Sequence, residues 1–132
     1  MTTASTKNVK IVPTADYDEI VSVVAHYENG LEAGNWDTIT KAFDDDAIMY
    51  GYTGDDLTSG TYKNLEAYVQ QFGAAPNGHT RVDILGITPT SAVVRIDMEG
   101  AADGTSYTDF HTLLKKDGRW TIIAKVFHQY EG

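Results

Sequence analysis

Two alternating runs of residues around Asp117-Gly118 place the strongest constraint on how this chain can fold. The dipeptide readily adopts the positive φ values of a type I′ turn, so residues 104–128 are predicted to form a long antiparallel hairpin. A two-residue turn would pair Lys116 with Arg119 and thereby decide which side chains share a face. One face is then expected to carry Tyr107, Asp109, His111, Leu113, Trp120, Ile122, Ala124, Val126 and His128.

The polar residues of this face gather at one end of the hairpin and are the candidate catalytic residues. Asp109 and His111 lie two positions apart on one strand, so both side chains can reach the same ligand and transfer protons near neutral pH. Tyr50, Tyr107 or His128 would then steady developing negative charge. The alternative is a buried hydrogen-bonded network without chemistry, in which Asp109 binds Tyr107 or a helix end. The pattern alone leaves both interpretations open.

The opposite face of the hairpin is expected to hold an apolar band, with Thr121 and Lys125 beside it. Such a band is too apolar for open solvent, which predicts a homodimer formed through Phe110, Thr112, Leu114, Ile123 and Phe127. Trp120 lies at the turn end of its strand, away from the polar cluster. It is therefore expected to anchor the core between the sheet and a helix.

Helical patterns precede the strands. Residues 1–13 are polar and aperiodic and are expected to form a flexible arm before a single domain over residues 14–132. A capping box at Asp16 and Glu19 begins a long amphipathic helix that Gly34 ends, and its buried stripe presents Tyr27 as a candidate ligand contact. Two shorter helices are predicted, after Asn35 and between Asn64 and Gly73.

Strands are expected over residues 47–52, 58–63, 80–88 and 92–100, ahead of the hairpin. This order predicts an α+β fold, a conical barrel in which a strongly bent antiparallel sheet and three N-terminal helices close a cavity. On the strand that ends at Gly100, Arg95 and Asp97 share one face while Val94, Ile96 and Met98 share the other. The sequence leaves open whether Arg95 and Asp97 bind a ligand in the cavity or form an outer ion pair.

Composition narrows the function. With 19 acidic and 10 basic residues the net charge is -9, which disfavours nucleic acids and anionic membrane surfaces as partners. The absence of cysteine excludes thiolate catalysis and Cys-type metal sites, and the four histidines lack metal-ligand spacing. No signal-peptide pattern or long apolar stretch occurs, so a cytoplasmic location is expected, with no metal and no cofactor.

Three segments carry a resemblance to a known family: residues 27–36 (Tyr-Glu-Asn-Gly-Leu-Glu-Ala-Gly-Asn-Trp), 43–51 (Phe-Asp-Asp-Asp-Ala-Ile-Met-Tyr-Gly) and 109–122 (Asp-Phe-His-Thr-Leu-Leu-Lys-Lys-Asp-Gly-Arg-Trp-Thr-Ile). In their order the chain resembles the nuclear-transport-factor-2-like superfamily, which includes SnoaL-like proteins, and most closely its putative lumazine-binding branch. The resemblance covers about residues 16–130 and implies a cystatin-like cone around a ligand cavity, commonly in a homodimer.

Catalytic relatives of this cone include ketosteroid isomerase, scytalone dehydratase, limonene epoxide hydrolase and polyketide cyclases. Arg95-Ile-Asp97 is similar to part of the epoxide hydrolase site, and Tyr50 or Tyr52 lies where that family positions a water molecule. The hydrolase's second aspartate falls at or near His128, so the match is incomplete. The resemblance therefore implies a cofactor-free isomerase, dehydratase or cyclase, or alternatively a non-catalytic protein that binds a small apolar or aromatic molecule.

Overall fold

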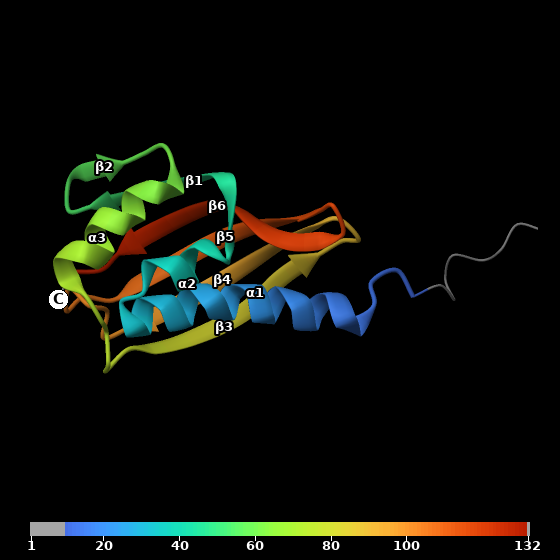
Figure 1. Ribbon diagram of the computed structural model, residues 1–132, viewed down its shortest axis with the longest axis horizontal. Helices are drawn as coiled ribbons and strands as arrows, with labels where there is room; N and C mark the ends of the chain where they lie inside the picture. The colour runs from blue at the N-terminus through green and yellow to red at the C-terminus, as the bar shows by residue number, and fades with distance from the viewer. Residues whose placement is uncertain (1–9, 132) are drawn as a thin grey trace, which may run out of the picture.

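The computed structural model describes residues 10–131, so residues 1–9 of the expected N-terminal arm lie outside the described residues. Within residues 10–131, three α-helices and one 3₁₀ helix cover one face of a six-stranded curved sheet (Figure 1). The helices are α1 (Thr14–Ala33), α2 (Trp36–Thr40), η2 (Tyr62–Asn64) and α3 (Leu65–Phe72). The strands are β1 (Phe43–Thr53), β2 (Asp56–Thr58), β3 (His79–Ile87), β4 (Ser91–Glu99), β5 (Tyr107–Lys116) and β6 (Arg119–Gln129).

The strand order is β2-β1-β6-β5-β4-β3, and the predicted α+β architecture is confirmed. Two details differ from the expectation. β1 pairs with β6 in parallel, because the helices α1 and α2 carry the chain to the far edge of the hairpin before β1 begins. The strand expected over residues 58–63 lies earlier, at Asp56–Thr58, and η2 begins at Tyr62.

Helix α1 lies along the concave face of the sheet and supplies much of the core (Figure 1). Its stripe of Ile20, Val24, Tyr27 and Leu31 is buried, as the helical spacing predicted. The expected capping box is wrong. Pro13 occupies the N-cap position, and both acidic side chains of the expected box turn toward the hairpin instead.

Trp120 connects α1 to the turn end of the hairpin. Its Nε1 donates to Asp16 Oδ1 at 3.3 Å and its backbone N–H donates to Glu19 Oε2 at 2.6 Å. Lys115 Nζ donates to the same Asp16 oxygen at 3.0 Å. With 3% of its surface exposed, Trp120 is the core anchor that its position predicted.

The hairpin turn agrees with the sequence, but the register changes along the strands. Asp117 and Gly118 have φ values of 53° and 77°, and Lys116 pairs with Arg119. Leu113 pairs with Ile122 and Thr112 with Ala124, so Ile123 is an extra residue on β6, a β-bulge. Because side chains alternate with a period of two, the bulge exchanges the faces of all later residues of β6. The expected inward positions of Ala124, Val126 and His128, and the expected outward positions of Lys125 and Phe127, are therefore wrong.

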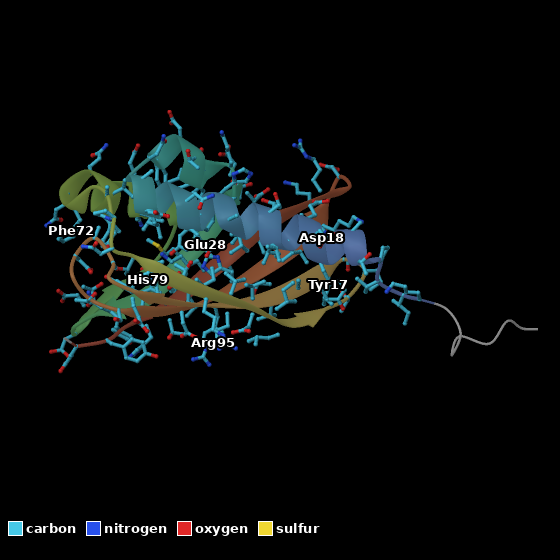
Figure 2. All side chains as sticks on the ribbon, turned by 90° about the horizontal axis from the view of Figure 1, so that it is seen from below. Tyr17, Asp18, Glu28, Phe72, His79 and Arg95 are labelled. Carbon is cyan, nitrogen blue, oxygen red and sulfur yellow. The ribbon has the colours of Figure 1, made fainter. Side chains whose placement is uncertain are left out.

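The strands β3, β4 and β5 form the expected antiparallel meander. Val94, Ile96 and Met98 of β4 face the core, which leaves Arg95 and Asp97 on the outer face. Figure 2 shows Arg95 on the side of the sheet away from α1. Across residues 10–131, none of the helices combines the length and apolar character needed to cross a membrane.

Candidate functional site

A cavity of about 160 Å³ lies between α1, α3 and the inner face of the sheet. Aromatic, methionine and leucine side chains make most of its wall, and a carboxylate and an amine supply the charges. It is lined by Tyr27, Leu31, Met49, Thr53, Thr58, Asn64, Leu65, Tyr68, Met98, Tyr107, Asp109, Lys125 and Phe127. A concave, mainly apolar site with a few convergent polar groups is typical of small-molecule binding.

Asp109 of β5 is the carboxylate in this wall and is only 1% exposed. Its Oδ2 accepts a hydrogen bond from the Tyr27 hydroxyl at 2.6 Å, and His111 Nε2 lies 3.2 Å from the same oxygen. Within residues 10–131, Oδ1 has no hydrogen-bond donor, so it can accept from a ligand.

Opposing influences determine the pKa of Asp109. Burial favours the neutral carboxyl, but the charge of Lys125 and then the hydrogen bonds of Oδ2 outweigh it, so the pKa lies below its ordinary value. Burial and the adjacent carboxylate together raise the pKa of the Tyr27 hydroxyl well above its ordinary value. At neutral pH the site therefore holds an ionised Asp109 and a protonated Tyr27.

His111 lies behind Asp109 and is fully buried. Its ring is 4.9 Å from the Tyr27 ring, centroid to centroid, and it is not part of the cavity wall. Burial lowers the pKa of the imidazole despite the nearby Asp109 carboxylate, so the neutral form with the proton on Nε2 fits best. Nδ1 then has no partner among the described residues. His111 is thus placed to orient Asp109 and not to touch a ligand.

Lys125 is the functional side chain that the sequence reasoning missed. The bulge at Ile123 turns it inward, where it is 5% exposed and lines the cavity. Its Nζ lies 5.1 Å from the Tyr27 ring centroid and 5.2 Å from that of Phe127. Burial lowers the pKa of this amine, and the Asp109 carboxylate only partly opposes that effect. The available signal was a single lysine within the apolar run of residues 122–127.

Tyr107 and Tyr68 form a second polar edge of the cavity. The Tyr107 hydroxyl donates to Asp103, and Gln129 Nε2 donates to Tyr107 at 3.0 Å. Burial raises the pKa of Tyr68 to about 12, and burial together with the Asp103 hydrogen bond raises that of Tyr107 further. Tyr107 lines the cavity as expected, with its hydroxyl already engaged by Asp103.

The other candidate residues lie on the outer face, away from the cavity. Tyr50 and Tyr52 are 42% and 58% exposed, because Met49 and Gly51 take the inward positions of β1. His128 is exposed and packs edge-on against Tyr130, with 4.7 Å between ring centroids. Arg95 Nε and Asp97 Oδ2 form an ion pair at 3.1 Å. Tyr50, Tyr52 and His128 were expected at the cavity, but the register of β1 and the bulge in β6 place them outside it. For Arg95 and Asp97, which the sequence left open, the register of β4 selects the outer ion pair.

Comparison with known proteins agrees with this geometry. The sequence model of the family described as putative lumazine-binding matches residues 15–128. The chain belongs to this family. The chain is therefore also a member of the nuclear-transport-factor-2-like (NTF2-like) superfamily, as the resemblance implied.

One protein similar to this chain is named as an enzyme. Aldolase FrzH of Cladobotryum sp. is 32% identical over 124 residues, which cover 92% of this chain and 97% of the relative. An NTF2-like protein of unknown function from Methylobacillus flagellatus has 36% identity and a TM-score of 0.85, over 91% of this chain and 96% of its own. A putative scytalone dehydratase from Novosphingobium aromaticivorans shares the fold at 17% identity and a TM-score of 0.68, over 89% and 86% of the two chains.

Among the described residues, possible metal-ligating side chains do not gather at the site. Within residues 10–131, no three histidine or acidic side chains converge as metal ligands. In particular, His128 lies on the opposite face of the sheet from Asp109 and His111, so these three cannot act together. The site can instead accept a proton at Asp109, present an amine at Lys125, and hold an apolar or aromatic molecule between its rings.

Proposed function

We propose that this protein is a small-molecule enzyme of the isomerase, dehydratase or cyclase kind that transfers a proton at a carbon atom in the cone cavity. The observation that carries the proposal is the arrangement at Asp109. One carboxylate oxygen is held by Tyr27 and His111, and the other is free to accept from a ligand in an apolar cavity. A fixed, buried carboxylate of this kind suits a general base.

In this proposal Asp109 Oδ1 takes a proton from a carbon next to a carbonyl group, and the electron pair moves toward the carbonyl oxygen. That negative charge must be stabilised for the reaction to be fast. Of the described residues that line the cavity, Lys125 is the only basic one. Tyr27 and His111 act as positioning residues, because they hold Oδ2 and leave Oδ1 to the substrate.

The likeness to aldolase FrzH supports the same class of reaction, since an aldol addition also begins with loss of a proton beside a carbonyl group. The apolar and aromatic wall supports a small apolar or aromatic substrate. The proposed proton transfer needs no cofactor.

The proposal is tested by deuterium exchange. Cyclohexanone is incubated with the protein in deuterated water, and loss of its α-proton signal is followed by NMR. The wild-type protein should accelerate exchange, and Asp109→Asn should abolish the acceleration because an amide keeps the shape but accepts no proton. Asp97→Asn is the matched control, since that carboxylate lies on the outer face. Equal exchange by wild type and Asp109→Asn would contradict the proposal.

A second candidate is a binding protein without turnover. It is favoured by the environment of Asp109, whose charge is already balanced by Lys125 and by two hydrogen-bond partners, and by the family description. Lumazine, a planar heterocycle, could then lie between the aromatic rings of the cavity. Fluorescence titration with lumazine that gave saturable binding, lost in Tyr68→Ala, together with no deuterium exchange, would favour this candidate over the enzyme.

A further inference from the structure

We propose that Lys125 is a nucleophilic amine that forms an iminium bond with a ketone or aldehyde in the cavity. This inference rests on the proposed function and deepens it, because it names carbonyl compounds as the substrate class and a covalent bond as the means of holding them. It assigns to Lys125 a role that the carboxylate chemistry at Asp109 does not require.

The first support is the way in which the fold places Lys125. The extra residue Ile123 turns the lysine away from the outer face, where the alternation from the turn would otherwise put it. The side chain is 5% exposed and ends in the cavity wall. A buried lysine is costly, so its inward position calls for a role beyond solubility.

The second support is the absence of an ion pair. Lys63, Lys115 and Lys116 each form one with an aspartate, at 3.4, 3.0 and 3.0 Å. Lys125 forms no ion pair and no hydrogen bond within residues 10–131, and its Nζ lies over the rings of Tyr27 and Phe127. Its amine is therefore left free on the side of the cavity.

The third support is the balance of charge around the amine. Schiff-base lysines react through the neutral amine, and burial in an apolar pocket increases the fraction in that form. Burial lowers the pKa of Lys125, and the carboxylate that opposes this effect lies beyond ion-pair distance. The titratable groups that face the amine come from α1, α3 and β5, and they are Tyr27, Tyr68, Tyr107, Asp109 and, behind them, His111.

The covalent step balances with groups that the cavity holds and with water. Neutral Nζ adds to the carbonyl carbon, and the carbonyl electron pair moves to oxygen, which takes a proton. The proton that the amine loses passes through Asp109 to this hydroxyl, which leaves as water as the C=N bond forms. Asp109 can then take the α-proton, the electron pair of the broken C–H bond forms a C=C bond, and the C=N electron pair moves to nitrogen to give the enamine. The enamine carbon attacks a proton or a second carbonyl carbon, and water finally hydrolyses the iminium to free the product and the amine.

The test is reductive trapping on the full chain. The protein is incubated near neutral pH with cyclohexanone and sodium cyanoborohydride, which adds hydride to an iminium carbon and leaves a stable secondary amine. Peptide mass spectrometry then locates the modified lysines. Lys125 should be modified several-fold faster than the exposed Lys41, because burial lowers the pKa of its amine and so raises the neutral, nucleophilic fraction. Modification at Lys125 no faster than at Lys41, or none at Lys125, would overturn the proposal.

Variants supply the controls. Lys125→Arg keeps the charge and Lys125→Met keeps the length, and neither offers an amine, so the modification at this position should disappear while Lys41→Met leaves it intact. Should the variants fold poorly, the mapped site in the wild-type protein still decides the question.

The deuterium exchange assay separates this inference from the proposed function. If exchange persists in Lys125→Arg and trapping at Lys125 fails, the acid–base enzyme stands and the iminium is refuted. If trapping succeeds and no exchange or turnover occurs, the inference stands and the proposed proton transfer fails.

Discussion

Three side chains act on the Asp109 carboxylate. Tyr27 and His111 hold Oδ2, and Lys125 of the neighbouring strand β6 contributes its charge. In a low dielectric such neighbours act strongly, so each of them controls the protonation of the carboxylate. The pKa of Asp109 therefore reports on the integrity of the whole site.

Tyr27→Phe should raise the pKa of Asp109, because it removes the 2.6 Å hydrogen bond that favours the ionised form. Carbon-13 NMR titration of the aspartate carboxyl measures the change directly. In the folded wild-type protein the group should titrate below 3.8, and in the variant its midpoint should move upward. Tyr50→Phe, on the outer face, serves as the control and should leave the midpoint unchanged. An unchanged titration midpoint in Tyr27→Phe would show that the Tyr27 hydroxyl does not stabilise the ionised carboxylate of Asp109.

The sequence predicted some site residues and missed others for a definite reason. Asp109, Tyr107 and Tyr27 reach the cavity because β5 and α1 keep a regular period from end to end. His128 and Lys125 exchange faces because of the bulge at Ile123. This bulge was not predicted, because no glycine or other local signal marks it. Register errors of this kind reverse every later residue of a strand.

The elements next to the site are joined by close contacts that sequence periodicity does not reveal. At one end of the hairpin, Trp120 ties β6 to α1 through Asp16 and Glu19. At the other end, the ring of Phe127 packs against Gly51 of β1. These two contacts hold the sheet and helix that enclose the cavity.

Trp120→Ala should lower the free energy of unfolding by about 3–5 kcal/mol, because it leaves a void in the core and removes the indole donor to Asp16. Urea or thermal unfolding measures the loss. Arg119→Ala, an exposed neighbour, should change stability little. If Trp120→Ala kept the melting temperature and abolished ligand binding, the residue would belong to the site and not to the core.

Gly51→Ala should destabilise the protein by about 1–3 kcal/mol, as overpacked positions do. A Cβ at this position would lie 2.5 Å from the Phe127 carbonyl oxygen and 2.6 Å from its ring, so the strand or the ring has to shift into the cavity. Gly86→Ala in β3 is the matched control, because a Cβ there meets nothing within 4 Å. Equal unfolding midpoints for the two variants would disprove the close approach.

The fold as a whole could be predicted from element order, whereas strand pairing could not. Helical and alternating patterns gave the three helices and the final four strands, and the resemblance supplied the cone. The parallel pairing of β1 with β6 joins segments more than 70 residues apart in the chain, and no local pattern encodes such a contact. This non-local pairing and the bulge in β6 together explain why the composition of the outer face was only partly predicted.

The outer face of the sheet nevertheless retains an apolar band, and it lies across four neighbouring strands. The sequence predicted Phe127 and Ile123 as exposed members of this band, and that prediction is wrong. The exposed side chains are Tyr50 of β1, Val126 of β6, Phe110 of β5 and Val93 of β4. Adjacent exposed rings and aliphatic groups of this kind favour a partner surface.

The protein should therefore form a homodimer through this band at micromolar concentration, since a second copy would bury the same side chains on both subunits. Light scattering coupled to size-exclusion chromatography should give twice the mass of the chain. Phe110→Glu should shift the mass toward the monomer, because it would bury a charge in the interface. Val21→Glu, on the exposed side of α1, is the matched control and should leave the dimer intact. A monomeric mass for the wild-type protein, or a dimer unaffected by Phe110→Glu, would show that this face does not mediate self-association.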